Sequence, residues 1–124
     1  MTSIKPVLTV RNAERALDFY TRAFGATEVS RVVNPNGIVA EMAIDDAEFM
    51  VVEEVPEAFN LSPQTLGGTS VRIHLLVSDP DAVAEQAVAR GATEIFPIAD
   101  QPYGLRQGRF ADPFGHHWLI GRPL

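Results

Sequence analysis

The 124-residue sequence contains no cysteine and has few aromatic residues, 8% of the total. Without thiols, a disulfide framework, a thiolate metal site and a cysteine nucleophile are all excluded. Basic residues are also scarce, ten against sixteen acidic ones, and the net charge of −6 disfavours binding to nucleic acid. No apolar run has membrane-spanning length, and the N-terminal MTSIKPVLTV lacks the pattern of a secretion signal. We therefore expect a cytoplasmic protein that does not insert into a membrane.

The first half of the chain has the pattern of one strand, one helix and three further strands. Asn12 is a good helix cap, and apolar residues follow it at spacings of three and four until Gly25, which favours a helix end. Asn34-Pro35-Asn36-Gly37 is a strong turn signal between two alternating segments. Strands are predicted at residues 5–10, 28–33, 38–44 and 48–53.

The second half repeats this order after a connection at residues 55–70, which is rich in Pro and Gly and has room for a short helical turn. We interpret the connection as a linker rather than a lid, because the pattern restarts directly after it. Asp79-Pro80 predicts a helix start and Gly91 its end. Strands are predicted at residues 71–77, 94–98, 106–111 and 116–122, with Trp118 on the helix-facing side of the last one.

An internal repeat ties the two halves together. Gly25-Ala26-Thr27-Glu28 recurs as residues 91–94, an offset of 66 (91 − 25), at the same place in both patterns. Shared helix caps would explain the glycines but not the three residues after them. The sequence therefore predicts one α+β domain over residues 1–124, built from two tandem βαβββ modules that form an open, curled mixed sheet. Module one covers residues 1–54, the connection 55–70 and module two 71–124.

Two segments carry a family resemblance. LTVRNAERALDFYTRAFGATE resembles the opening of the glyoxalase/bleomycin resistance/extradiol dioxygenase (vicinal oxygen chelate) superfamily, and DPFGHHW resembles its closing strand, especially in the PhnB-like branch. The resemblance implies a small-molecule ligand in a sheet-lined cup and a homodimer, because modules from different chains often complete each cup in this family. The sequence leaves open whether the modules pair within one chain or are swapped between two. It does not select a reaction, because members include isomerases, dioxygenases, thiol transferases and antibiotic-sequestering proteins.

The resemblance also implies where a divalent metal would bind. The family's ligands are His or Gln on the first strand of each module and Glu on the last, which fall here on Lys5, Arg72, Leu119 and, in a less certain register, Val51. None of these side chains is an ordinary metal ligand. We therefore expect no metal cofactor. The alternative is a divalent metal at a displaced site, made by His74, His117 and either Glu41 or Glu53.

Strand alternation indicates which side chains face the cup. Lys5, Val7 and Thr9 share one face of the first strand, and Arg72 and His74 share the matching face in module two. Lys5 and Arg72 are pseudo-equivalent, so they either bind a carboxylate or phosphate together, or reach solvent and pair with acidic residues. The residues expected to contact a ligand are Lys5, Val7, Thr9, Val51, Glu53, Arg72, His74, Tyr103, Arg106, His117 and Leu119.

Three functions remain open at this point. The first is metal-free binding of a small organic molecule in the cup, as in the family's antibiotic-binding members. The second is a metal-dependent lyase, isomerase or dioxygenase of glyoxalase type, which requires converging His and carboxylate groups. The third is a structural or regulatory module whose cup is filled by its own side chains.

Overall fold

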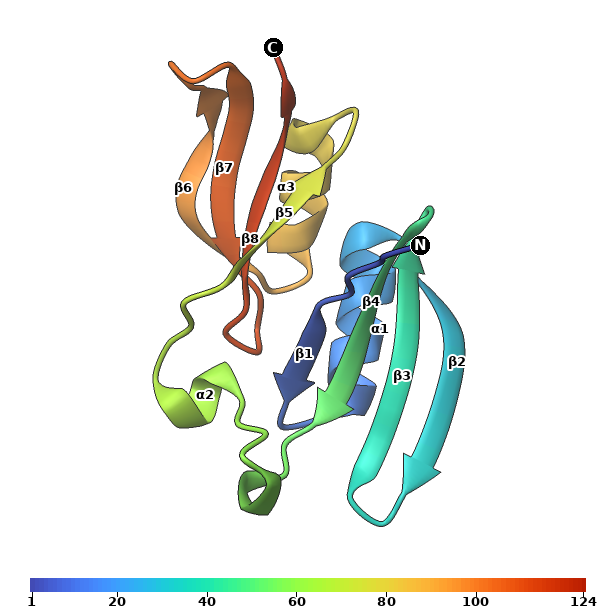
Figure 1. Ribbon diagram of the computed structural model, residues 1–124. Coiled ribbons are helices and arrows are strands. Elements are labelled where there is room, and N and C mark those ends of the chain that lie inside the picture. Colours follow the sequence, from blue (N-terminus) through green and yellow to red (C-terminus); the bar gives the residue numbers. More distant parts are fainter.

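The computed structural model describes residues 1–124 and contains two four-stranded mixed sheets, each packed against its own helix (Figure 1). In the first sheet the strands lie in the order β1-β4-β3-β2, with β1 parallel to β4 and the other neighbours antiparallel. Its elements are β1 (Val7–Val10), α1 (Ala13–Phe24), β2 (Thr27–Asn34), β3 (Gly37–Ile44) and β4 (Ala47–Glu53).

The second sheet repeats this arrangement in the order β5-β8-β7-β6. Its elements are β5 (Arg72–Leu76), α3 (Pro80–Ala89), β6 (Thr93–Asp100), β7 (Leu105–Ala111) and β8 (His117–Pro123). The connection holds two short helices, η1 (Pro56–Ala58) and α2 (Pro63–Leu66), where the sequence left room for one short helical turn. The α+β fold of two βαβββ units is therefore confirmed.

The internal repeat extends to details of the backbone. Gly25 and Gly91 both have positive φ, +69° and +118°, where a side chain would be strained. After each of them an edge strand begins and then bulges at the same point, between Glu28 and Ser30 in β2 and between Glu94 and Phe96 in β6. The bulges are 66 residues apart (94 − 28), which is the offset of the sequence repeat.

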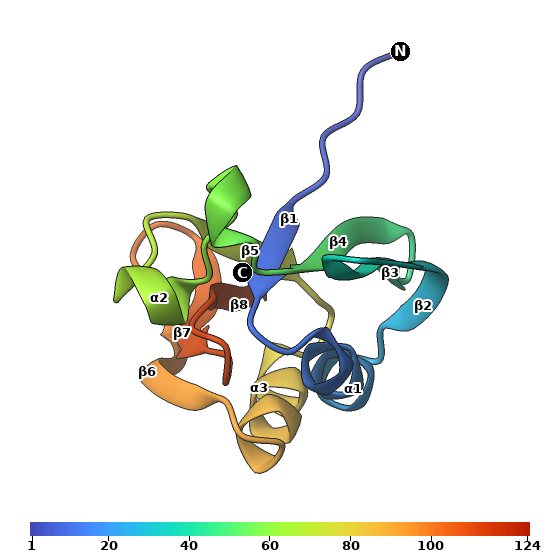
Figure 2. The same ribbon diagram turned by 90° about the horizontal axis from the view of Figure 1, so that it is seen from below.

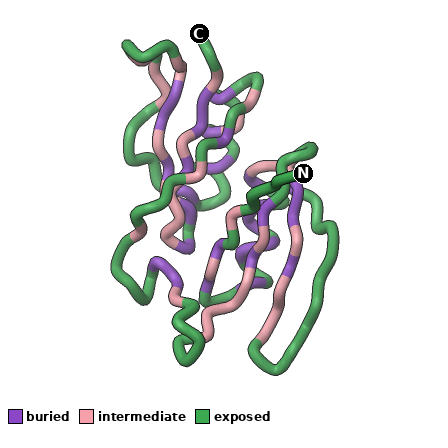
Figure 3. The backbone as a smooth tube through the Cα atoms, viewed as in Figure 1, coloured by how far each residue is buried: buried purple, intermediate pink, exposed green.

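One apolar core joins the two units. α1 and α3 lie side by side on the same side of the molecule, as the view from below shows (Figure 2). Between them and the sheets six aromatic rings are in mutual contact, Phe19, Tyr20, Phe24 and Phe49 from the first unit with Phe114 and Trp118 from the second. Trp118 is 2% exposed and its ring lies 4.7 Å from that of Phe24 in α1, so its predicted place on the helix-facing side is confirmed. Buried stretches of backbone occur in both units (Figure 3).

A buried carboxylate, Asp112, links the units through polar contacts. Its Oδ2 accepts hydrogen bonds from the Tyr20 hydroxyl at 2.6 Å and from the Trp118 indole N–H at 2.9 Å. Its Oδ1 accepts from the backbone N–H groups of Phe114 and His116. Burial, followed by the nearby Asp112 charge and hydrogen bond, raises the pKa of Tyr20 well above its ordinary value. The turn between β7 and β8 is thereby fixed to α1.

The opposite face of each sheet is left open. Large apolar side chains such as Val32, Leu76 and Phe96 are more than half exposed there. None of the helices combines the length and the apolar character needed to span a lipid bilayer.

Candidate functional site

The open face of the second sheet carries a hollow of about 400 Å³, which we call the module-two hollow. Phe96 and Tyr103 form aromatic walls, and Arg72 and Arg109 contribute positive charge. The other lining residues are Pro97, Ala99, Gln101, Gln107, Gly108 and Leu119. Of the residues predicted to contact a ligand, Arg72, Tyr103 and Leu119 are brought together here.

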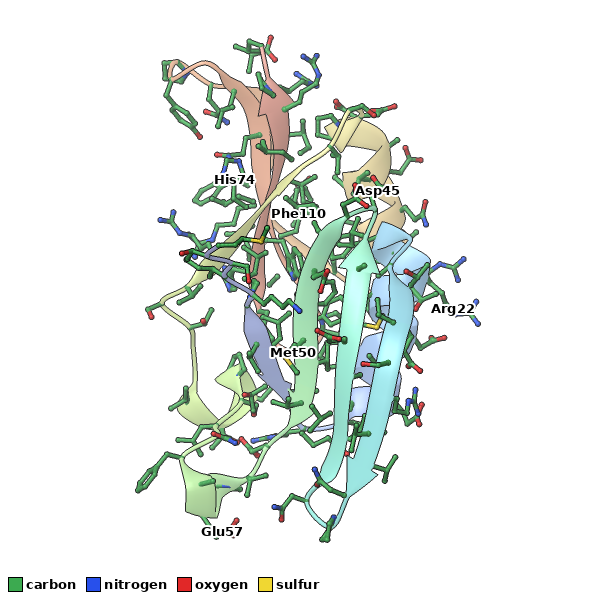
Figure 4. All side chains as sticks on the ribbon, turned by 45° about the vertical axis from the view of Figure 1, so that its right-hand side comes forward. Arg22, Asp45, Met50, Glu57, His74 and Phe110 are labelled. Atoms are coloured by element: carbon green, nitrogen blue, oxygen red, sulfur yellow. The ribbon has the colours of Figure 1, made fainter.

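A polar network lies beneath this hollow. The Tyr103 hydroxyl donates to Oε1 of Gln107 at 2.8 Å, and Nε2 of Gln107 lies 3.2 Å from Nε2 of His74. Gln107 is 7% exposed, and these two contacts fix its side-chain amide. Its backbone carbonyl oxygen accepts from the side-chain amide of Gln101 at 3.1 Å. His74 projects from β5 on the side away from α3 (Figure 4). The network holds Tyr103 against the strands that carry the arginines.

Arg72 and Arg109 have no carboxylate within ion-pair distance. Arg109 instead donates its Nε–H to Nδ1 of His117 at 2.9 Å, an acceptor that only an imidazole unprotonated at Nδ1 can offer. Burial, and after it the Arg109 charge, lowers the pKa of His117 below its ordinary value, although Asp112 acts in the opposite direction. His117 therefore supports Arg109 as a neutral ring.

The equivalent position of module one has the opposite character. Nζ of Lys5 lies 2.6 Å from Glu41 and 2.8 Å from Glu48. These contacts raise the pKa of Lys5 well above its usual range and lower the pKa of Glu41. Of the two alternatives given for Lys5, the structure supports pairing with acidic residues.

Glu41 in the first sheet and Arg109 in the second occupy equivalent positions of the two modules. Glu41 is paired with Ser30 just after the bulge of β2, and Arg109 is paired with Phe96 just after the bulge of β6. Ser30 and Phe96 are 66 residues apart (96 − 30), the offset of the repeat. Module one thus has a lysine and a glutamate where module two has two arginines, and only the second surface retains positive charge.

The open face of the first sheet has a smaller hollow, of about 240 Å³, that includes Val7, Thr9 and Glu53. The Glu53 carboxylate accepts the backbone N–H of Ile38 at 2.9 Å and is 3.5 Å from the backbone nitrogen of Ala13. It therefore bridges β3 and the start of α1.

Two predicted positions are corrected by the structure. Val51 is fully buried in the core, on the helix-facing side of β4, and its neighbours Met50 and Val52 point the other way (Figure 4 labels Met50). Arg106 does not line the hollow, because its guanidinium is bound to Asp81 at 2.7 Å and to Asp100 at 3.0 Å. Both errors concern the direction of a side chain on a correctly predicted strand.

The side chains do not fit the metal site that the resemblance implies. Lys5, Arg72, Leu119 and Val51 stand at the implied ligand positions, and none is a ligand that suits a divalent metal. Of the alternative donors, Glu41 is engaged by Lys5, Glu53 by backbone N–H groups and His117 by Arg109. No three His, Asp or Glu side chains in the structure are grouped so that they could hold a metal ion.

Residues 4–120 match the Glyoxalase/Bleomycin resistance protein/Dioxygenase superfamily. The chain belongs to this superfamily. An uncharacterized protein of Mycobacterium bovis is 42% identical over 127 residues, which cover 98% of this chain and 84% of that protein. A protein of Mycobacterium tuberculosis strain H37Rv, also uncharacterized, has the same identity and 75% of its length covered.

Several solved structures share the fold of this chain. TioX from Micromonospora sp. ML1 is 30% identical with a TM-score of 0.75, and the match covers 98% of this chain and 100% of TioX. A gene product of Arabidopsis thaliana is 28% identical with a TM-score of 0.76, covering 96% and 97%. TnmS3, an antibiotic binding protein from Streptomyces sp. CB03234, shares the fold at 23% identity, with a TM-score of 0.73 and coverage of 99% and 98%.

Proposed function

We propose that this protein binds a small organic anion in the module-two hollow and does so without a metal ion. The proposal rests on the following observation. Module two has Arg109 at the position where module one has Glu41, and Arg109 lines the same hollow as Arg72, which has no ion-pair partner. Two guanidinium groups on a surface without a carboxylate leave their charge to be balanced by a ligand.

The shape and chemistry of the hollow indicate the form of that anion. Guanidinium groups bind carboxylate and phosphate oxygens in a bidentate way. Phe96 and Tyr103 offer aromatic surface, and Tyr103 is held in place by Gln107. A ligand with a flat apolar body and one acidic group would satisfy both features. TnmS3, an antibiotic binding protein, is a precedent for binding of a small molecule on the same fold.

We further propose that the active form is a homodimer. The module-two hollow is open on one side, and the exposed apolar side chains of the first sheet, including Val7 and Val32, form a surface of suitable character to cover it from a second copy. The anion would then lie between the two chains.

The proposal is tested by calorimetric titration with benzoate, 4-hydroxybenzoate and phenylphosphonate in buffer containing a chelator, with uncharged benzamide as the matched neutral compound. We expect the acids to bind and benzamide to bind at least tenfold more weakly. Arg72→Gln combined with Arg109→Gln should abolish the preference for acids. Arg122→Gln, which removes a half-buried arginine outside the hollow, should leave this preference unchanged.

The competing function is a metal-dependent reaction, which the placement of His74 and His117 on adjacent strands of the same open face would favour. Titration of metal-depleted protein with Zn²⁺, Ni²⁺, Mn²⁺ and anaerobic Fe²⁺ separates the two functions. Tight stoichiometric binding that His74→Ala removes would overturn the metal-free proposal. Equal binding of benzamide and the acids would overturn the assignment of an anionic ligand.

A further inference from the structure

A cavity of about 850 Å³ lies on the helix side, away from the module-two hollow. We call it the interhelical groove. Its walls come from α1 (Arg15, Asp18, Phe19 and Arg22), from the residue that ends α3 (Arg90) and from the β7–β8 turn (Phe114). α1 and α3 lie next to each other at this place (Figure 2), and Arg22 extends outward from α1 (Figure 4).

Positive charge is concentrated in this groove although the protein is acidic. Of the nine arginines of the protein, four line the groove: Arg11, Arg15, Arg22 and Arg90. The groove is also lined by two acidic residues, Glu14 and Asp18. The lining therefore carries a net charge of +2 (4 − 2) in a chain whose net charge is −6.

Both carboxylates are already engaged. Asp18 accepts the Nε–H of Arg22 at 2.8 Å, and Glu14 is paired with Arg31, which is not part of the groove. Arg11 donates to the Thr65 hydroxyl at 3.2 Å and lies 4.0 Å from Glu54.

Arg15 and Arg90 are left without an ion pair, although the chain has sixteen acidic residues that could have supplied one. The first turn of the twelve-residue helix α1 also borders the groove, and the positive end of its dipole adds to the field of Arg15. Arg90 itself offsets the negative end of α3. Two free guanidinium groups thus face one cavity whose floor includes the aromatic contact between Phe19 and Phe114.

We propose that the interhelical groove is a second ligand site, one that binds an oligophosphate group, either free or carried by a nucleoside. A multiply charged phosphate chain can accept several bidentate guanidinium contacts at once, which a single carboxylate cannot. The groove is larger than the module-two hollow and has room for a chain of phosphates with an attached base. Its occupation requires no metal and no change in the open faces of the sheets.

The test uses inorganic tripolyphosphate and, separately, adenosine triphosphate as probes in calorimetry without divalent cations. Arg15→Gln combined with Arg90→Gln should weaken tripolyphosphate binding at least tenfold, and higher salt should weaken binding to the unmodified protein. Arg122→Gln is the matched control and should change nothing. Tighter binding of the nucleotide than of tripolyphosphate assigns a nucleoside-linked ligand, and equal binding assigns the free chain.

Because the module-two hollow also contains arginines, the site must be located independently. Amide chemical shifts in a titration with tripolyphosphate should move at residues 11–22, 89–91 and 113–115. The proposal is overturned if tripolyphosphate does not bind, or if its binding is lost in the Arg72→Gln and Arg109→Gln variant and retained in the groove variant. Binding of benzoate should be unaffected by the groove variant, so failure at one site is distinguishable from failure at the other.

Discussion

At the residue scale, the most demanding position is Asp112, whose carboxylate is buried and accepts four hydrogen bonds. The Trp118 indole N–H comes from the strand that follows the turn, but the Tyr20 hydroxyl comes from α1, far away in the sequence, and only the tertiary fold brings it to Asp112. The carboxylate accepts on both oxygens, while an amide accepts on one only. Asparagine therefore has the right shape and the wrong hydrogen-bonding pattern.

We expect Asp112→Asn to destabilise the protein by about 3 kcal/mol, because in either orientation its buried NH₂ group would face an N–H group that can only donate, either the indole of Trp118 or the backbone of the turn. Tyr20→Phe removes a single donor and leaves the carboxylate three others, so it should cost only about 1 kcal/mol. Urea unfolding followed by Trp118 fluorescence measures both variants. An Asp112→Asn protein as stable as the unmodified one would show that the four contacts do not hold the units together.

At the element scale, the strands and helices could be predicted from alternation, caps and turn residues, while the direction of some side chains could not. Residues 48–53 were correctly assigned to a strand, yet Val51 was placed on the wrong face, because moving the register by one residue turns every side chain to the other side. The two-residue turn that pairs Ile44 with Ala47 fixes this register, and it directs Val51 into the core. Gln107 and Arg109 were not predicted, although alternation along residues 106–111 sets them on the face opposite the buried Phe110.

The hollow depends on the close approach of β6 to β7 at Gly108. A Cβ atom there would lie 2.7 Å from the backbone oxygen of Phe96 and 2.8 Å from the nitrogen of Ile98. We expect Gly108→Ala to cost about 2 kcal/mol and to weaken benzoate binding, since the irregular part of β6 that carries Phe96 must move outward. Gly68→Ala is the control, because that position has open space and no positive φ. Thermal unfolding and calorimetry measure the effect, and equal behaviour of the two variants would contradict it.

At the scale of the whole molecule, the duplicated units are not independent of each other. The sequence repeat predicted two equivalent modules, each with its own helix and sheet, and it could not show that their apolar sides merge. The largest buried side chains come from both units, with Tyr20 and Met42 from the first and Phe110 and Trp118 from the second. Separating the units would expose this surface on both, and neither has enough of a core to replace it.

We therefore expect the chain to unfold in one cooperative transition, with far-ultraviolet circular dichroism and Trp118 fluorescence giving the same midpoint. Trp118 reports on the shared seam, since its ring is 5.6 Å from that of Tyr20 and 4.7 Å from that of Phe24. A fluorescence change well before the loss of secondary structure would mean that the units separate first and unfold later. Single-transition behaviour would instead show that the two units, with their open faces, are joined into one cooperative structure by the core between α1, α3 and the two sheets.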